Sequence, residues 1–171
     1  MNATDFRETI ISQYHAALEM LKQAILACPE TLWHRPDDRT PFWQIAYHAL
    51  FFTHVYVQAS EQAFSPWIGH RDEYRFEKDV ARTSLAEPAV PATKAIVLEY
   101  LAFCQHQVAE KVSVMVLDAA SGFDWLTFTK FELQLYSIRH IQQHVGELME
   151  RLGTPAGEID WVGSSRDWID R

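Results

Sequence analysis

The sequence predicts an all-α fold, a four-helix bundle with a long crossover between its second and third helices. Three observations lead to this prediction. Apolar residues recur every three or four positions over four long stretches, residues that start and stop helices bound those stretches, and a long segment containing Pro and Gly separates the middle two. The helices are expected at residues 4–27, 41–63, 93–117 and 128–152, with a short tail after them. At 171 residues, the chain is expected to form a single domain, residues 1–171.

The first two expected helices differ in how much of their surface is apolar. The helix at 4–27 carries an apolar stripe along one side and ends before Pro29. The helix at 41–63 begins with Pro41, which suits a helix start, and is apolar almost all the way round. A helix of that kind belongs in the middle of a bundle rather than on its surface.

The crossover, residues 64–92, is charged and interrupted by prolines and a glycine. We expect it to be a long ordered connection with a short helix inside, folded over one end of the molecule. The third helix follows Thr93 as its N-cap, and the fourth ends at Gly153, with Pro155 just beyond.

Composition narrows the partners that we expect. The formal net charge is −8 and no run of Lys or Arg occurs, so the chain lacks the usual electrostatic source of nucleic-acid binding. No apolar stretch approaches the length of a membrane span, and the first residues, MNATDFRETI, do not resemble a signal peptide. We therefore expect a soluble, cytoplasmic protein, in which the two isolated cysteines, Cys28 and Cys104, are free and buried.

Two of the eight histidines, His140 and His144, are one helical turn apart in the fourth expected helix. At about 100° per residue they lie roughly 40° apart around the helix axis, so both can point into the bundle. Glu147 and Tyr136 fall on the same face. Two imidazoles at this spacing can clamp a metal ion, but the pair fits equally well with two polar residues that share a helix face.

His48, on the apolar second helix, offers a third ligand. Alone it is read as a core histidine with a hydrogen-bond partner, because an unpaired buried polar group costs about 1–3 kcal/mol. Together with the pair, it predicts three histidines that converge from two helices and leave one coordination position open, as in catalytic zinc sites. Gln44, one turn earlier, is expected to hold the imidazole of His48 from outside the metal's own ligand shell. His54 lies about 240° round the helix and is expected to pack elsewhere.

Several other kinds of site are excluded. The residues between the paired histidines are Ile141, Gln142 and Gln143, so the glutamate base of the HExxH zinc proteases is missing. No histidine has Glu three residues before it, as di-iron bundles require. A mononuclear, histidine-rich site or no site at all remains, and no catalytic residue beyond the ligands is assigned.

The sequence resembles the DinB-like (YfiT-type) family of metal-dependent four-helix bundles, over most of the chain. The resemblance rests on the stretch WQIAYH at 43–48, on HIQQHVGEL at 140–148, and on Leu32 and Trp33 in the first connection. It implies a four-helix bundle with a long crossover between helices two and three.

The resemblance also implies a divalent ion, zinc or nickel, bound by His48, His140 and His144. It further implies a low-molecular-weight thiol as cofactor and a small-molecule electrophile as substrate, in an S-transferase, isomerase or hydrolase reaction. The family often carries glutamine or a similar polar residue in place of Glu147, so this carboxylate is not part of the implied ligand set.

Three interpretations of function stay open at this point. The first is the metal-dependent enzyme, with Gln44, Tyr136 and Glu147 beside the site or in its substrate pocket. The second is a non-catalytic bundle that binds a metal ion or a small ligand. The third is a purely structural bundle, which would form a homodimer through an apolar helix face.

Overall fold

The computed structural model describes residues 3–74, 90–153 and 159–165, and within these ranges it is all-α. Four of its α-helices are long: α1 (Ala3–Ala27), α3 (Phe42–Tyr56), α4 (Lys94–Ser113) and α5 (Lys130–Leu152). Three elements are short: α2 (Glu30–Trp33) and the 3₁₀ helices η1 (Glu61–Ala63) and η2 (Asp72–Tyr74). The predicted fold class, all-α, is confirmed for the described part of the chain.

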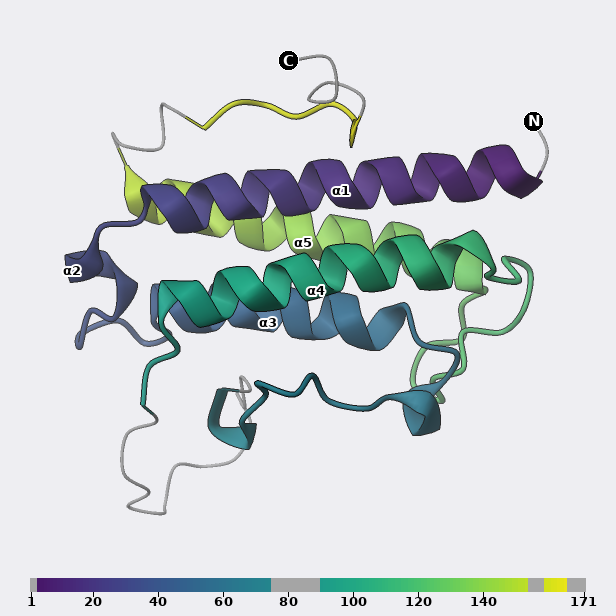
Figure 1. Cartoon of the computed structure of the whole chain (residues 1–171), viewed down its shortest axis with the longest axis horizontal. Helices are drawn as coiled ribbons and strands as arrows, with labels where there is room; N and C mark the ends of the chain where they lie inside the picture. The colour runs from purple at the N-terminus through teal and green to yellow at the C-terminus, as the bar shows by residue number, and fades with distance from the viewer. Residues whose placement is uncertain (1–2, 75–89, 154–158, 166–171) are drawn as a thin grey trace.

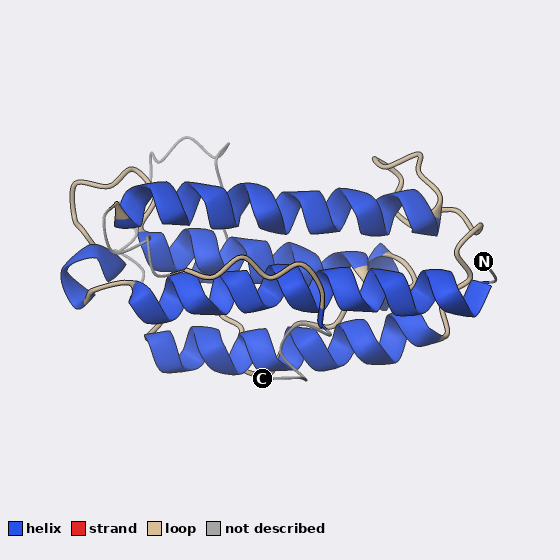
Figure 2. Cartoon of the chain, turned by 90° about the horizontal axis from the view of Figure 1, so that it is seen from above, coloured by secondary structure: helices blue, strands red, loops and turns tan. Residues whose placement is uncertain are grey.

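The four long helices lie side by side as a bundle (Figures 1 and 2). α1 packs along α4 and α5, and α3 packs along the same two helices from the other side. α1 and α3 are therefore diagonal to each other, and α5 shares one long seam with each of them. None of the helices in the described ranges combines the length and the apolarity needed to cross a membrane.

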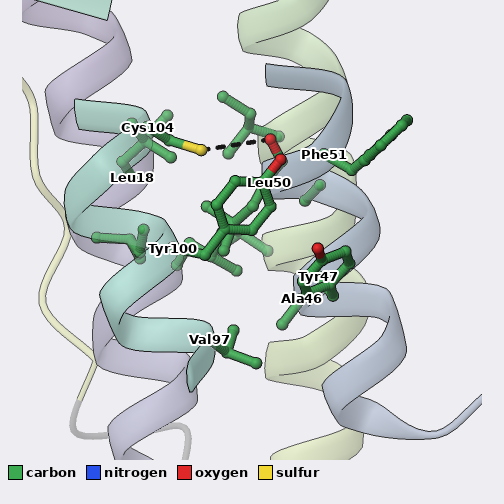
Figure 3. Packing of buried hydrophobic residues seen from close by; sticks show 14 of the residues in the cluster. Leu18, Ala46, Tyr47, Leu50, Phe51, Val97, Tyr100 and Cys104 are labelled. Carbon is green, nitrogen blue, oxygen red and sulfur yellow. Dashed lines mark hydrogen bonds between the residues drawn. The ribbon is translucent and has the colours of Figure 1, made fainter. Parts of the chain in front are cut away.

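The core is filled from all four helices, and α3 supplies more of its aromatic side chains than any other helix. Twelve of the fifteen residues of α3 are buried, as the apolar composition of this segment predicted. Figure 3 shows Leu18 of α1, Leu50 of α3 and Tyr100 of α4 meeting in the interior. Cys104 lies there as well, and its Sγ donates to the backbone carbonyl of Leu50 at 3.4 Å. Both Cys28 and Cys104 are free and buried, as predicted.

Side-chain caps begin the last two helices, at Thr93 as predicted and at Thr129, which places the start of α5 at Lys130 and not at the expected residue 128. The Thr93 hydroxyl accepts a hydrogen bond from the backbone N–H of Ile96, and the Thr129 hydroxyl accepts one from that of Glu132. α5 ends at Gly153, whose φ of +64° is a conformation that favours glycine. The predicted start of α4 and end of α5 are confirmed.

The second helix is shorter than predicted, because α3 ends at Tyr56 while the sequence pattern carried it to residue 63. Ser60 adopts an extended conformation, with φ −159° and ψ 173°, and its hydroxyl caps η1. The buried side chain of Lys130 donates to the carbonyl of Gln58 at 2.7 Å. Partners from outside the helix thus replace the hydrogen bonds that further helical turns would have made.

The third helix is shorter than predicted for a similar reason. α4 ends at Ser113, whereas the pattern carried it to Leu117. The backbone carbonyls of Leu117 and Ala119 accept hydrogen bonds from the N–H groups of Phe131 and Lys130, both at 2.8 Å. The segment after α4 is therefore held against the start of α5 instead of continuing the helix.

The two connections in the first half of the chain are only partly as expected. α2 is a single helical turn in the first connection, which the sequence did not predict. In the crossover at 64–92, the described part contains the 3₁₀ turn η2 as its short helix, and residues 75–89 lie outside the described residues. η1 lies just before this segment, in residues that were predicted as the end of the second helix.

Candidate metal centre

The candidate site lies where α3 packs against α5. The three residues of α3 that are not buried are Gln44, His48 and Phe52, which are four positions apart and form one stripe. On α5, His140 and His144 are also half-buried. The two stripes meet along the seam between the helices, and this brings the three histidines together.

This position differs from the prediction that the histidines point into the bundle. The face of α5 that is directed inward carries Ile141, Val145 and Leu148, all buried. His140 and His144 lie beside this apolar face and not within it, and the side chain of His144 is 14% exposed. The site is therefore a half-buried cluster at the edge of the core that solvent can reach.

The three imidazoles converge through the same ring atom. Nε2 of His140 lies 3.2 Å from Nε2 of His48 and 3.1 Å from Nε2 of His144. The three ligand atoms all lie within 4.8 Å of one another. Nitrogens bound to one tetrahedral zinc ion at about 2.0–2.1 Å are separated by about 3.3 Å. The spacing within the cluster is thus close to the spacing that a shared divalent ion requires.

Hydrogen bonds among the imidazoles satisfy this cluster poorly. A neutral imidazole has one N–H and one acceptor nitrogen, so Nε2 of His140 forms one good hydrogen bond and not two. Its other nitrogen, Nδ1, is buried and has no hydrogen-bond partner among the described residues. A shared cation at the three Nε2 atoms would satisfy all three lone pairs at once, so the residues fit a metal ion.

Burial keeps His140 in the protonation state that a metal ion needs. Loss of hydration lowers the pKa of His140 to about 4, and the neighbouring His144 adds to the effect. Near neutral pH this ring is uncharged, and neutral imidazole is the form that binds metal ions.

Glu147 holds His144 from the side away from the cluster. Its Oε2 lies 3.2 Å from Nδ1 of His144, and its Oε1 accepts from Nη2 of Arg151 at 3.1 Å. Arg151 also donates to the backbone carbonyl of Thr40 at 2.7 Å, so the start of α3 and the end of α5 are joined. A carboxylate at Nδ1 places the proton there and leaves the lone pair of Nε2 directed at the cluster.

Sequence reasoning missed two neighbours of the site. The ring of Phe52 lies 4.8 Å from that of His48 and 5.7 Å from that of His140, between centroids, and covers one side of the cluster. Arg151 is the second. Their spacing could have identified both, because Phe52 is one turn after His48 and Arg151 is one turn after Glu147.

Of the other predicted neighbours, Gln44 lies on the same helix stripe as His48, whereas Tyr136 packs away from the imidazoles. Gln44 is half-buried on the same stripe of α3 as His48. Tyr136 lies one turn before His140, but its ring packs against Tyr56 at 5.7 Å and Phe128 at 5.6 Å. Among the described residues, its ring therefore packs against aromatic residues at the end of the seam and not against the imidazoles.

Two further histidines, His54 and His70, lie outside the cluster and each contacts a tyrosine hydroxyl. His54 is buried on a different face of α3 from His48, as predicted, with Nδ1 3.2 Å from the hydroxyl of Tyr100. His70 lies in the loop between η1 and η2, but its side chain is only 7% exposed. Its Nδ1 lies 2.7 Å from the hydroxyl of Tyr47. The proline-containing crossover folds back onto α3 and buries this ring, which the local sequence does not indicate.

Comparisons of the chain with models of known protein families, with curated proteins and with solved structures find no match. The functional interpretation therefore depends on the geometry and chemistry of the three histidines.

Proposed function

We propose that this chain is a metal-dependent enzyme similar to the DinB-like (YfiT-type) bundles, with one divalent ion, zinc or nickel, held by His48, His140 and His144. The observation that carries the proposal is the convergence of three Nε2 atoms, in which Nε2 of His140 lies near two others and can form a good hydrogen bond with one of them. A metal ion on Nε2 of His140 would leave the ring proton on its buried Nδ1, which has no partner among the described residues.

The proposed reaction class is transfer of a low-molecular-weight thiol to a small electrophile, or a related isomerisation or hydrolysis. A divalent ion with three protein ligands supplies Lewis acidity at its open positions, which lowers the pKa of a bound thiol or water. The chain's own residues fix the ligands and limit access. Glu147 sets the tautomer of His144, and the ring of Phe52 shields the cluster from water on one side.

A second candidate is a bundle that holds the ion without turnover. Glu147 is the carboxylate beside the cluster, and its two oxygens already contact His144 and Arg151. A general base needs a free position from which to take a proton. This engagement favours a positioning role for Glu147, and it is the observation that supports the non-catalytic alternative.

Metal content tests the site. Protein purified without a histidine tag is expected to carry about one divalent ion per chain, and His48→Ala, His140→Ala and His144→Ala are each expected to remove it. His106→Ala is the matched control, because His106 is an exposed histidine on α4 beside Glu110. Elemental analysis by mass spectrometry gives the result. Full occupancy in a variant that lacks all three histidines would contradict the assignment.

Activity assays separate the two candidates once the metal content is known. Metal-loaded protein is assayed with a panel of small thiols and electrophiles, and turnover is expected in the wild type and not in His144→Ala. Consistent inactivity of fully loaded protein across the panel would favour the binding module. Activity that persists in the metal-free variant would exclude a role for the cluster.

A further inference from the structure

A second polar feature lies on a different face of α3 from the three histidines. A cavity of about 450 Å³ opens between the end of α3, the second half of α4 and the segment at 63–68. Its volume falls within the range of small-molecule sites, about 300–1,000 Å³. The residues that define its chemistry are His54, Gln58, Trp67, Phe103, Gln107 and Lys111.

His54, 3% exposed, is the more deeply buried of two buried polar residues that line this cavity, the other being Gln58. Its Nδ1 lies 3.2 Å from the hydroxyl of Tyr100, and the ring is the only hydrogen-bond partner of that buried hydroxyl in the described part of the chain. A buried O–H group needs an acceptor, so Tyr100 donates and Nδ1 accepts. The proton of the neutral ring is therefore on Nε2, which has no partner among the described residues.

The protonation state of His54 is consistent with this tautomer. Burial lowers its pKa to about 4, and the nearby charge of Lys111 contributes to the shift. Near neutral pH the ring thus presents a single N–H donor. The ammonium group of Lys111 also pairs with Glu110 at 2.9 Å, so the positive charge at the cavity is partly balanced.

The walls of the cavity are aromatic. The ring of Phe103 lies 4.9 Å from that of His54 in an edge-to-face arrangement. Trp67 stacks on Tyr100 at 4.9 Å and lines the cavity from the crossover. Flat apolar surfaces of this kind suit an aromatic ring.

We propose that this cavity binds a small aromatic carboxylate, with its ring against the aromatic wall formed by Trp67 and Phe103 and one oxygen accepting from Nε2–H of His54. The charge of Lys111 favours the carboxylate over a neutral analogue of the same shape. This site is separate from the metal centre and does not depend on the function proposed for it, because His48 and His54 are on different faces of α3.

The test uses 2-naphthoate and its neutral analogue 2-naphthamide as probes, with affinities measured by ligand-detected NMR titration. Naphthoate is expected to bind more tightly than naphthamide. His54→Phe keeps an aromatic ring but removes the donor, and it is expected to weaken naphthoate binding at least tenfold. Lys111→Gln is expected to weaken naphthoate about threefold or more and to leave naphthamide unchanged.

Lys22→Gln is the control, because Lys22 on α1 also pairs with a glutamate, Glu19, and does not line the cavity. It is expected to change neither affinity. Naphthoate binding that is absent at millimolar concentration, or that is equal in the wild type, His54→Phe and Lys111→Gln, would overturn the proposal.

Imidazole NMR signals of the unaltered protein keep the proposal testable if His54→Phe does not fold. Naphthoate is expected to shift the Nε2–H signal of His54 and to leave the signals of His48, His140 and His144 in place. A shift confined to the three clustered histidines would mean that the carboxylate binds at the metal centre, and the second site would be rejected.

Discussion

Glu147 is the residue on which the orientation of His144 depends. A ligating imidazole has to present one nitrogen to the ion, and a hydrogen bond to the other nitrogen decides which one. Glu147 makes this bond to His144, and Arg151 fixes the carboxylate in turn. His140 has no such partner among the described residues. Of these two histidines on α5, only His144 is therefore held in place by a hydrogen bond to a carboxylate.

Replacing Glu147 with Gln is expected to weaken metal binding about tenfold, because the amide is a weaker acceptor and loses its ion pair with Arg151. Affinity is measured by competition with a chelator of known strength. Glu150→Gln is the control, an exposed position on the same helix. Equal losses of metal affinity in the two variants would show that the affinity depends on the overall negative charge of α5 and not on the contact with His144.

Buried neutral histidines also predict how stability depends on pH. The unfolded chain takes up protons on its histidines near pH 6.5, whereas folded His54 does so only near pH 4. Below pH 6.5 the unfolded state therefore binds more protons, and the free energy of unfolding falls as the pH is lowered toward 4. In the metal-free protein His140 contributes in the same direction.

The contribution of His54 can be isolated in His54→Phe. Between pH 7 and pH 5, this variant is expected to lose about 1–2 kcal/mol less stability than the wild type. Urea unfolding in the presence of a chelator measures the difference. His106→Ala, which changes an exposed histidine, is expected to follow the wild-type curve, and a His54→Phe curve parallel to the wild type would contradict the assignment.

At the scale of the helix, α5 contains a glycine that its packing does not require. A side-chain carbon placed on Gly146 would meet nothing within 4 Å, and the residue is exposed. Gly146→Ala is therefore expected to raise the free energy of unfolding by about 0.5–1 kcal/mol. Thermal and urea unfolding check this, with metal content unchanged. A loss of stability would mean that this face of α5 has a partner that the single chain does not contain.

The sequence predicted the long helices well because their signals are local. The apolar repeats, the caps at Thr93 and the stop at Gly153 each act within a few residues. The ends of α3 and α4 were predicted too late in the chain, because tertiary contacts decide them. The carbonyl of Gln58 accepts a hydrogen bond from Lys130, which is 72 positions away, and no local sequence pattern predicts that bond.

The three histidines were predicted as a group from helix spacing, since two lie on one helix face and one on the neighbouring helix. Their depth was not predicted. An apolar helix such as α3 still leaves one stripe outside the core, and only the packing against α5 shows that His48 belongs to it. Phe52, on the same stripe, was missed for that reason.

At the scale of the whole molecule, the connection between α4 and α5 is pressed against the end of α3. The carbonyl of Gly122 accepts from the N–H of Glu61 at 3.1 Å. Gly122 has a φ of +85°, and a side-chain carbon there would lie 2.3 Å from the carbonyl oxygen of Ala59. This close approach leaves room for glycine alone.

Gly122→Ala is therefore expected to lower the free energy of unfolding by about 2–4 kcal/mol, through backbone strain and the clash with Ala59. Gly153→Ala is the comparison, because its φ is also positive but the space around it is open. It is expected to cost only about 1 kcal/mol. Urea unfolding measures both, and equal losses would mean that backbone conformation matters and the contact does not.

Gln134 links three of the four long helices. It accepts from the hydroxyl of Tyr14 at 2.8 Å and donates to the backbone carbonyl of Tyr56 at 3.2 Å. α1 thus finds its main neighbours in α4 and α5, and the end of α3 is completed by residues of α5. During synthesis, α1 and α3 leave the ribosome well before α5, the helix that packs against both of them. The nascent chain must therefore hold α1 and α3 without their final partners, and the bundle closes only when the last of the long helices has emerged.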